Sequence, residues 1–190
     1  MKIGVFALQG AFIEHERALL SLGEEVKEIR LLSDFTNDLD GIVLPGGEST
    51  VQGKLLKEEG LFEPVKKAIE GGLPVFGTCA GLILLAKKLT NDPNVYFGTL
   101  NATVKRNAYG RQLGSFSASL NVKPLGFYPA VFIRAPYIES IGKGVEILAE
   151  HEGKIVAARQ ANMLATAFHP ELTDDLRMHA YFLDMVREAK

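Results

Sequence analysis

The 190-residue chain is predicted to be an α/β protein, with a mostly parallel sheet covered by helices on both faces and antiparallel strands added at one side. In the first half of the chain, short apolar runs alternate with segments of helical periodicity. Strands and helices that alternate at this spacing are typical of a parallel sheet. From Gly98 onward, β-formers, Gly and Pro are frequent and helical periodicity is weak, which favours antiparallel strands and hairpins.

Each element of the first half follows from a local pattern. Alternating or continuous apolar runs predict strands, apolar residues at helical spacing predict helices, and glycines at 23 and 71–72 end those helices. The predicted strands are 2–8, 24–32, 40–47 and 73–78, and the predicted helices are 12–23 and 61–72.

The end of the chain predicts a helix over residues 173–190. Thr173 is the expected N-cap, Asp174 and Asp175 lie in the first turn, and an apolar stripe begins at Leu176. The stretch EHEGK before it predicts a turn. Since no linker, repeat or low-complexity tract is present, residues 1–190 are expected to form a single domain.

Composition excludes several classes of function. The 21 basic and 23 acidic residues give a formal net charge of −2, so no nucleic-acid partner is expected. One cysteine cannot form an internal disulfide, and no apolar run approaches the length of a membrane span. The opening MKIGVFALQG lacks the pattern of a signal peptide. These observations predict a cytoplasmic protein with no membrane partner.

The single cysteine occupies the stretch GTCAGLILLA, residues 77–86, after an apolar run and before a helix-like stretch. Cys79 between Gly77 and Gly81 has the form of a nucleophile elbow, in which small neighbours permit a sharp turn from strand to helix. The thiol would stand at the carboxyl end of a central strand, where open α/β sheets bind ligands. A helix N-terminus beside it favours the thiolate. The alternative interpretation is a small buried hydrophobic residue.

A general base for this thiol is predicted at His169. In ATAFHPEL it ends an apolar run, and Pro170 disfavours helical geometry for the residue before it. In an extended segment, residues two apart project to the same side, so Glu171 can hold one ring nitrogen of His169. This pair is the base and orienting part of a triad. The alternative is a strand-end histidine followed by a helix-capping glutamate. Solvated or partly packed side chains are expected for the other histidines, His15, His151 and His179.

Two backbone N–H groups are candidates for an oxyanion hole. The stretch LPGGEST, residues 44–50, places paired glycines at the carboxyl end of a strand, where the N–H of Gly47 can face a developing negative charge. The N–H of Ala80 is the second donor by elbow geometry. Taken alone, the glycine pair is equally typical of a turn.

Together, GTCAGLILLA, LPGGEST, FHPE and the opening GVFALQGAF resemble the class I, or triad, glutamine amidotransferases. The resemblance covers essentially the whole chain, with no departure at a catalytic position. Within that family it is closest to the glutaminases of two-protein pyridoxal 5′-phosphate synthases, for which RNAYGRQ (106–112) and FIRAP (132–136) are the more specific signatures.

The resemblance implies a flavodoxin-like, three-layer α/β/α fold with Cys79 as nucleophile, His169 as acid and base, and Glu171 as the orienting carboxylate. Glu48 can face the α-ammonium of glutamine, and Arg106 can face its α-carboxylate. Without the resemblance, Arg106 and Arg134 would be interpreted as ordinary surface charges. Gln9, in the loop after the first strand, can reach the oxyanion region and is the candidate for contact with a partner. The glutamine contacts that the resemblance implies are Gly46, Gly47, Glu48, Arg106, Ile133 and Arg134.

The predicted reaction is hydrolysis of L-glutamine to L-glutamate and ammonia through a thioester on Cys79. No metal or other cofactor is expected, because one cysteine and scattered histidines offer no ligand cluster. Ammonia in neutral water is mostly ammonium, so a synthase partner that receives it directly is expected. The resemblance implies a barrel-shaped subunit that builds pyridoxal 5′-phosphate, in a hetero-oligomer. The alternatives are an amidotransferase for another synthase, a related cysteine hydrolase or peptidase, and a binding or redox-sensing module with an oxidisable Cys79.

Overall fold

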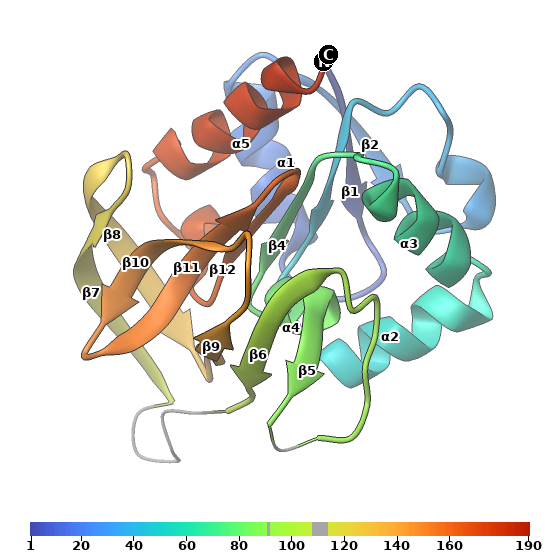
Figure 1. Ribbon diagram of the computed structural model, residues 1–190. Helices are drawn as coiled ribbons and strands as arrows, with labels where there is room; N and C mark the ends of the chain where they lie inside the picture. The colour runs from blue at the N-terminus through green and yellow to red at the C-terminus, as the bar shows by residue number, and fades with distance from the viewer. Residues whose placement is uncertain (91, 108–113) are drawn as a thin grey trace.

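The computed structural model describes residues 1–90, 92–107 and 114–190, and Figure 1 shows their arrangement. The strands are β1 Lys2–Phe6, β2 Glu25–Ile29, β3 Gly41–Leu44, β4 Val75–Thr78, β5 Ala86–Leu89, β6 Leu100–Lys105, β7 Ser115–Val122, β8 Gly126–Ile133, β9 Tyr137–Ile141, β10 Glu146–His151, β11 Lys154–Gln160 and β12 Met163–Thr166. The helices are α1 Phe12–Ser21, α2 Ser49–Glu58, α3 Phe62–Glu70, α4 Ala80–Leu85 and α5 Arg177–Glu188, with 3-10 turns η1 Leu32–Asp34 and η2 Pro170–Leu172.

A ten-stranded sheet forms the centre of the molecule, in the order β2-β1-β3-β4-β12-β11-β9-β6-β5, with β10 paired to β11. The five strands from β2 to β12 run parallel, whereas β11 is antiparallel to its neighbours β12, β9 and β10. The predicted architecture, a mostly parallel sheet with added antiparallel strands, is confirmed. Strands β3, β4 and β12 are buried along their whole length, which explains why their sequences are continuously apolar.

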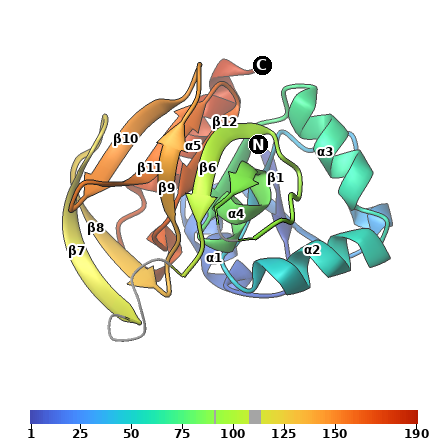
Figure 2. The ribbon, with the colours of Figure 1, turned by 60° about the horizontal axis from the view of Figure 1, so that its bottom comes forward.

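Helices cover both faces of the parallel strands (Figures 1 and 2). On one face, Phe76 of β4 packs against His15 of α1 and against Phe182 of α5. On the other face, α4 follows β4 and packs against α2, which in turn contacts α3. These layers give the predicted flavodoxin-like α/β/α fold, and they hold the carboxyl ends of the parallel strands at one edge.

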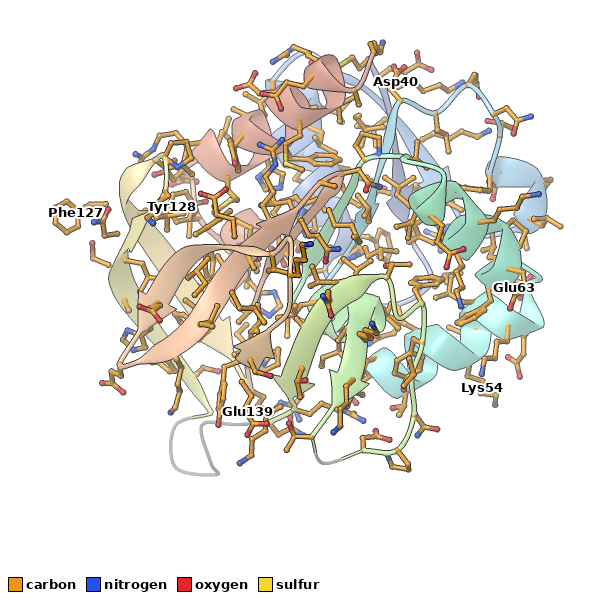
Figure 3. The ribbon with its side chains drawn as sticks, in the orientation of Figure 1. Asp40, Lys54, Glu63, Phe127, Tyr128 and Glu139 are labelled. Carbon is orange, nitrogen blue, oxygen red and sulfur yellow. The ribbon has the colours of Figure 1, made fainter. Side chains whose placement is uncertain are left out.

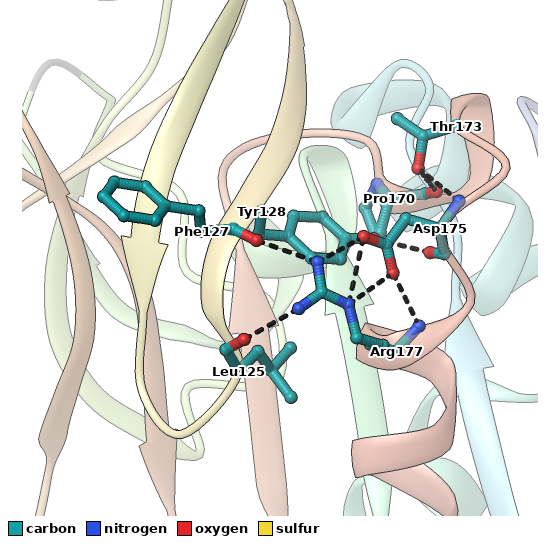
Figure 4. A network of polar contacts seen from close by, with 7 residues as sticks. All are labelled: Leu125, Phe127, Tyr128, Pro170, Thr173, Asp175 and Arg177. Atoms are coloured by element: carbon teal, nitrogen blue, oxygen red, sulfur yellow. Dashed lines mark hydrogen bonds and ion pairs between the residues drawn. The ribbon is translucent and has the colours of Figure 1, made fainter.

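A two-stranded ribbon, β7–β8, stands beside the antiparallel end of the sheet. Its residues alternate between the two sides, as strand geometry requires: Phe127 is 78% exposed and points away from the molecule, whereas Tyr128 is fully buried (Figure 3). The guanidinium of Arg177, the first residue of α5, fixes the start of β8 by donating to the carbonyls of Leu125 (2.7 Å) and Phe127 (2.8 Å) (Figure 4). The Tyr128 hydroxyl donates to the Asp175 carbonyl at 2.9 Å. The ribbon is therefore tied to the segment that enters the last helix.

The last helix begins later than the sequence predicts. The proposed N-cap, Thr173, instead closes a bend: its hydroxyl donates to the Pro170 carbonyl and accepts the N–H of Asp175. Asp175 takes the capping role, because its carboxylate accepts the N–H of Arg177 at 3.1 Å. The predicted helix over 173–190 is therefore wrong for its first turn and correct from Arg177 onward.

Two further elements differ from expectation. Helix α2, which begins inside LPGGEST at Ser49, was not among the predicted helices, and the predicted strand 24–32 shortens to Glu25–Ile29 before η1. No helix in the described part of the chain is long and apolar enough to cross a membrane.

Candidate active site

Four loops meet where the parallel strands β1, β3, β4 and β12 end. They carry, in chain order, Gln9, the Gly46–Gly47 pair, Cys79 and the segment from His169 to Glu171. Carboxyl ends of neighbouring parallel strands lie at the same sheet edge, so residues distant in sequence come together there.

The elbow at Cys79 has the geometry that its glycines predict. Cys79 has φ 49° and ψ −99°, a conformation that L-residues rarely adopt, and its N–H donates to the Thr166 carbonyl at 2.8 Å. A Cβ at Gly77 would lie 2.8 Å from the backbone of Gly81, and a Cβ at Gly81 would overlap the Leu44 carbonyl. Only residues without a side chain fit at these two positions, and the thiol is thereby held at the start of α4.

His169 and Glu171 form the expected pair. The imidazole Nδ1 lies 2.7 Å from Glu171 Oε1, and both side chains are buried. The backbone N–H of His169 donates to the Val131 carbonyl. Glu171 lies in the 3-10 turn η2 and not in an extended segment, so the tight turn, and not strand alternation, brings the two side chains together. This corrects the predicted local structure but not the predicted contact.

The charge state of His169 reflects its neighbours. Burial disfavours the imidazolium, but hydrogen bonds to Cys79 and Glu171, together with their negative charges, outweigh burial and raise the pKa of His169 to about 10. At neutral pH the ring is therefore held protonated between an anionic carboxylate and the sulfur.

The glycine pair closes tightly over the catalytic side chains. A Cβ at Gly46 would overlap the His169 ring and would lie 3.3 Å from Cβ of Cys79. The Gly46 carbonyl accepts the N–H of Ala11 at 3.1 Å. Because the carbonyl and N–H of one trans peptide point in opposite directions, the N–H of Gly47 is turned away from Ala11.

Side chains of two glutamines join the first loop to the glycine loop. Gln9 Oε1 accepts the N–H of Glu48 at 2.7 Å. Gln52, on α2, donates from Nε2 to the carbonyls of Gln9 (2.9 Å) and Pro45 (3.2 Å). These hydrogen bonds therefore join the first loop directly to the glycine loop.

A cavity of about 160 Å³ opens over the thiol. Among the described residues its lining consists of Gln9, Gly47, Glu48, Ser49, Cys79, Ile83, Arg106, Asn107, Ile133, Arg134 and His169. The predicted site residues outside this lining are Gly46, which packs under His169, Ala80, which follows Cys79, and Glu171, which lies behind His169.

The lining combines an acidic group with basic ones, which suits a zwitterionic ligand. Glu48 is exposed, and Arg106 lies in the cavity wall with Nη1 2.6 Å from Asp92 Oδ2. Arg134 is exposed, with φ 42°, and its N–H donates to the Gly114 carbonyl at 2.5 Å. Residues 108–112 of the signature RNAYGRQ lie outside the described residues.

Sequence reasoning missed three lining residues, Ser49, Ile83 and Asn107. A signal exists for Ile83, which stands four residues after Cys79 and therefore one helical turn along α4. Ser49 and Asn107 directly follow predicted ligand residues, and position alone does not show that their side chains face the cavity.

The expectation for His15 and His179 was wrong. Both are fully buried between α1 and α5, with His15 Nδ1 2.9 Å from His179 Nε2. For His15 the missed signal is its spacing in the helix. It precedes buried Ala18 and Leu19 by three and four residues, which is the period of a buried helix face. In the described residues no group of three or more His, Cys, Asp or Glu is arranged to hold a metal ion.

Comparison with known proteins gives consistent results. A model of the SNO glutamine amidotransferase family matches residues 5–188. The chain is 56% identical over 191 residues to pyridoxal 5′-phosphate synthase subunit PdxT of Streptococcus pneumoniae (strain ATCC 700669 / Spain 23F-1), covering 99% of each chain. A crystal structure of a glutamine amidotransferase superposes with a TM-score of 0.93 at 48% identity, covering 97% of this chain and 98% of the other. A putative GMP synthase protein from Thermoplasma acidophilum, with TM-score 0.70, 22% identity and 99% and 94% coverage, shares the fold.

Proposed function

Because the chain belongs to the SNO glutamine amidotransferase family, we propose that it is the glutaminase subunit of a pyridoxal 5′-phosphate synthase. It hydrolyses L-glutamine to L-glutamate and ammonia, and it delivers the ammonia to a synthase subunit. The observation that carries this proposal is the chain of contacts from Cys79 through His169 to Glu171 at one edge of the sheet.

The proposed reaction proceeds in two halves. The Cys79 thiolate attacks the side-chain amide of glutamine, and the N–H groups of Gly47 and Ala80 stabilise the oxyanion. The His169 imidazolium gives its proton to the departing nitrogen, which leaves as ammonia. Neutral His169 then takes a proton from water, which attacks the thioester and releases glutamate. The Cys79 thiolate and the His169 imidazolium are regenerated, so one glutamine and one water give one glutamate and one ammonia.

The proposed substrate contacts follow the charges of the cavity. Glu48 faces the α-ammonium of glutamine, and Arg106 and Arg134 lie on the side that receives its α-carboxylate. Asp92 holds the Arg106 guanidinium in place before the substrate binds. Gly46 and Ile133 complete the site, the first by its close contact with His169 and the second as an apolar wall.

The proposed partner is a barrel-shaped synthase subunit that consumes ammonia. Ammonia released into neutral water is rapidly protonated and stops being a nucleophile, so the reaction is useful only beside an acceptor. Full-length similarity to a protein named as a synthase subunit supports a pyridoxal 5′-phosphate synthase over another synthase. A separating experiment supplies the synthase partner with its sugar phosphates and compares glutamine with ammonium as nitrogen source. Pyridoxal 5′-phosphate must form from both, and from glutamine only when this chain is added.

The catalytic assignment is tested by Cys79→Ser. The variant should release ammonia from glutamine at least about 10³-fold more slowly with the synthase subunit present, because a hydroxyl is a far weaker nucleophile than a thiolate. Circular dichroism and thermal unfolding establish that the variant is folded. A folded Cys79→Ser protein with near-parental turnover would reject the assignment.

A second pair of variants tests the roles of the base and its carboxylate. His169→Asn should be nearly as inactive as Cys79→Ser, because the proton of both half-reactions passes through this ring. Glu171→Gln should lose less, because it keeps a hydrogen-bonding side chain against Nδ1. An inactive Glu171→Gln beside an active His169→Asn would show that the roles are misassigned.

A further inference from the structure

A buried polar cluster lies behind Glu171, on the side away from the substrate cavity. His15 of α1 presents Nε2 to Glu171 Oε2 at 3.4 Å and to Thr78 Oγ1 at 3.1 Å. His15 Nδ1 lies 2.9 Å from Nε2 of His179, on α5. All four side chains are buried, so the carboxylate oxygen Oε2 faces His15 out of reach of solvent. The proposed reaction assigns no part to either histidine.

The donors and acceptors of this cluster allow two arrangements of protons. In the first, His15 carries its proton on Nε2 and donates toward Glu171 and Thr78, while its bare Nδ1 accepts from His179 Nε2–H. In the second, His15 carries its proton on Nδ1 and donates to His179, and its Nε2 accepts from the Thr78 hydroxyl.

The carboxylate decides between the two arrangements. The second would place the lone pair of His15 Nε2 against anionic Glu171 Oε2 and would leave the Nδ1–H of His179 buried without an acceptor. The first turns the positive end of the Nε2–H bond toward Oε2, which accepts no hydrogen bond, and leaves an unpaired acceptor at His179 Nδ1, which costs less than an unpaired N–H. The first arrangement is therefore the stable one.

We propose that His15 is a positioning residue for the reaction: its Nε2–H donates to Thr78 and sets its positive end 3.4 Å from Oε2 of Glu171, so that Oε1 stays on His169, and His179 fixes the tautomer of His15 from behind. His179 then donates to His15, His15 donates to Thr78 beside Glu171, and His169 donates to Glu171 from its other side. The kinetic consequence rests on the proposed function, whereas the assignment of protons does not.

The neutrality of both rings agrees with this arrangement. Burial, with the charges of His179 and His169, holds the pKa of His15 well below its ordinary value. Burial alone lowers the pKa of His179 to about 4. The groups that face His15 are Phe76, Thr78, Glu171 and His179, so Glu171 is the one carboxylate among them. A neutral donor suits this place, since it orients the carboxylate without cancelling the charge that His169 requires.

Nuclear magnetic resonance of the protein labelled with nitrogen-15 in histidine tests the proposal directly. Couplings from the ring nitrogens to the ring carbon-bound protons identify which nitrogen bears the proton, and His15→Asn and His179→Gln spectra assign the signals. At pH 7, His15 and His179 should both be protonated on Nε2 and bare on Nδ1. Any other protonation of His15 overturns the proposal. This readout does not depend on glutaminase activity.

Two substitutions at one position supply the kinetic test. The amide of glutamine reaches as far as Nε2 of histidine, whereas that of asparagine reaches only as far as Nδ1. With the synthase subunit present, His15→Asn should lower kcat on the order of tenfold and leave KM within about twofold, because His15 is not in the cavity wall. His15→Gln should recover most of kcat. His151→Asn, on β10 and outside the site, is the control for a histidine-to-asparagine change.

The outcomes separate this proposal from the proposed function. Parental kcat in His15→Asn, or equal losses in His15→Asn and His15→Gln, would overturn the role of the Nε2–H. If His15→Asn fails to fold, the tautomers measured in the parental protein still decide. If the parental protein releases no ammonia from glutamine, the proposed function fails while the resonance experiment still tests the arrangement of protons.

Discussion

At the scale of single residues, the candidate nucleophile is held in a strained backbone conformation. The φ of 49° and ψ of −99° at Cys79 place a side-chain-bearing residue where only glycine is comfortable. The bond to the Thr166 carbonyl and the contact of Gly77 with Gly81 maintain this geometry. The strain is the structural cost of presenting the thiol at the start of α4, and it can be measured separately from activity.

Replacing Cys79 by glycine should relieve this strain. At ordinary helix or strand positions, a glycine in place of alanine lowers the free energy of unfolding by about 0.5–1 kcal/mol. We expect Cys79→Gly to be at least as stable as Cys79→Ala, because relief of about 1–3 kcal/mol of strain offsets the added chain entropy. Urea unfolding of both variants measures the difference. Ala68→Gly in the middle of α3 is the matched control and should show the ordinary loss. A similar loss at position 79 would contradict the strain.

At the scale of elements, α1 and α5 meet through two buried histidines that stay neutral. The unfolded chain binds a proton on each near the ordinary pKa of 6.5, but burial lowers the pKa of His179 to about 4 in the folded protein. Between these values the unfolded chain binds more protons, so the free energy of unfolding falls as the pH falls. His169 contributes little in this window, because its raised pKa keeps it protonated in the folded protein and the unfolded chain protonates it below the ordinary pKa of 6.5.

The expected loss of stability from His179 alone is about 1.6 kcal/mol between pH 6.5 and pH 5, with a slope that approaches about 1.4 kcal/mol for each pH unit. Denaturant unfolding at the two pH values measures it. His179→Gln, which has no titrating group but keeps an N–H toward His15, should lose correspondingly less between the same two values. Equal pH dependence in the parental and His179→Gln proteins would mean that His179 is not buried in its neutral form.

Much of the order of helices and strands could be predicted, because hydrophobic periodicity and the glycines and prolines that end an element are local properties of the sequence. The apolar runs of β3 and β4 and the glycine after α1 mark their positions without knowledge of the fold. Thr173 misleads because a second capping residue, Asp175, stands two positions later. The bonds that tie Asp175 and Arg177 to the start of β8 have no local signature. The closeness of Cys79, His169 and Glu171 was predictable from motifs, whereas the contact of His15 with Glu171 joins α1 to η2 and has no local signature.

At the scale of the whole molecule, the first loop links the surface to the candidate oxyanion peptide. Ala11 holds the Gly46 carbonyl, Gln9 holds the N–H of Glu48, and the same loop leads into α1, where Ile13 and Leu20 are exposed. Glycine reaches both signs of φ at little cost, so the Gly46–Gly47 peptide can take more than one orientation. A partner that binds this loop would change which orientation prevails.

We therefore expect the isolated chain to be a poor glutaminase and the synthase subunit to raise its turnover. Loss of one oxyanion-hole donor lowers the rate by about 10²–10³-fold, so the synthase subunit should raise turnover by no more than this factor. Ammonia release measured with and without saturating synthase subunit tests this. Equal turnover with and without the partner would remove the switch.

The position of β12 has a consequence for synthesis of the chain. This strand is the last to be made, yet it inserts between β4 and β11, in the parallel part of the sheet. Until it emerges from the ribosome, β4 has an unpaired edge, Cys79 lacks the Thr166 carbonyl that holds its turn, and His169 does not yet exist. Pairing of such distant segments is slow, and the waiting edge is open to aggregation. A chain that ends before residue 169 carries a thiol with no base, so glutamine hydrolysis cannot begin before His169 and Glu171 have been synthesised.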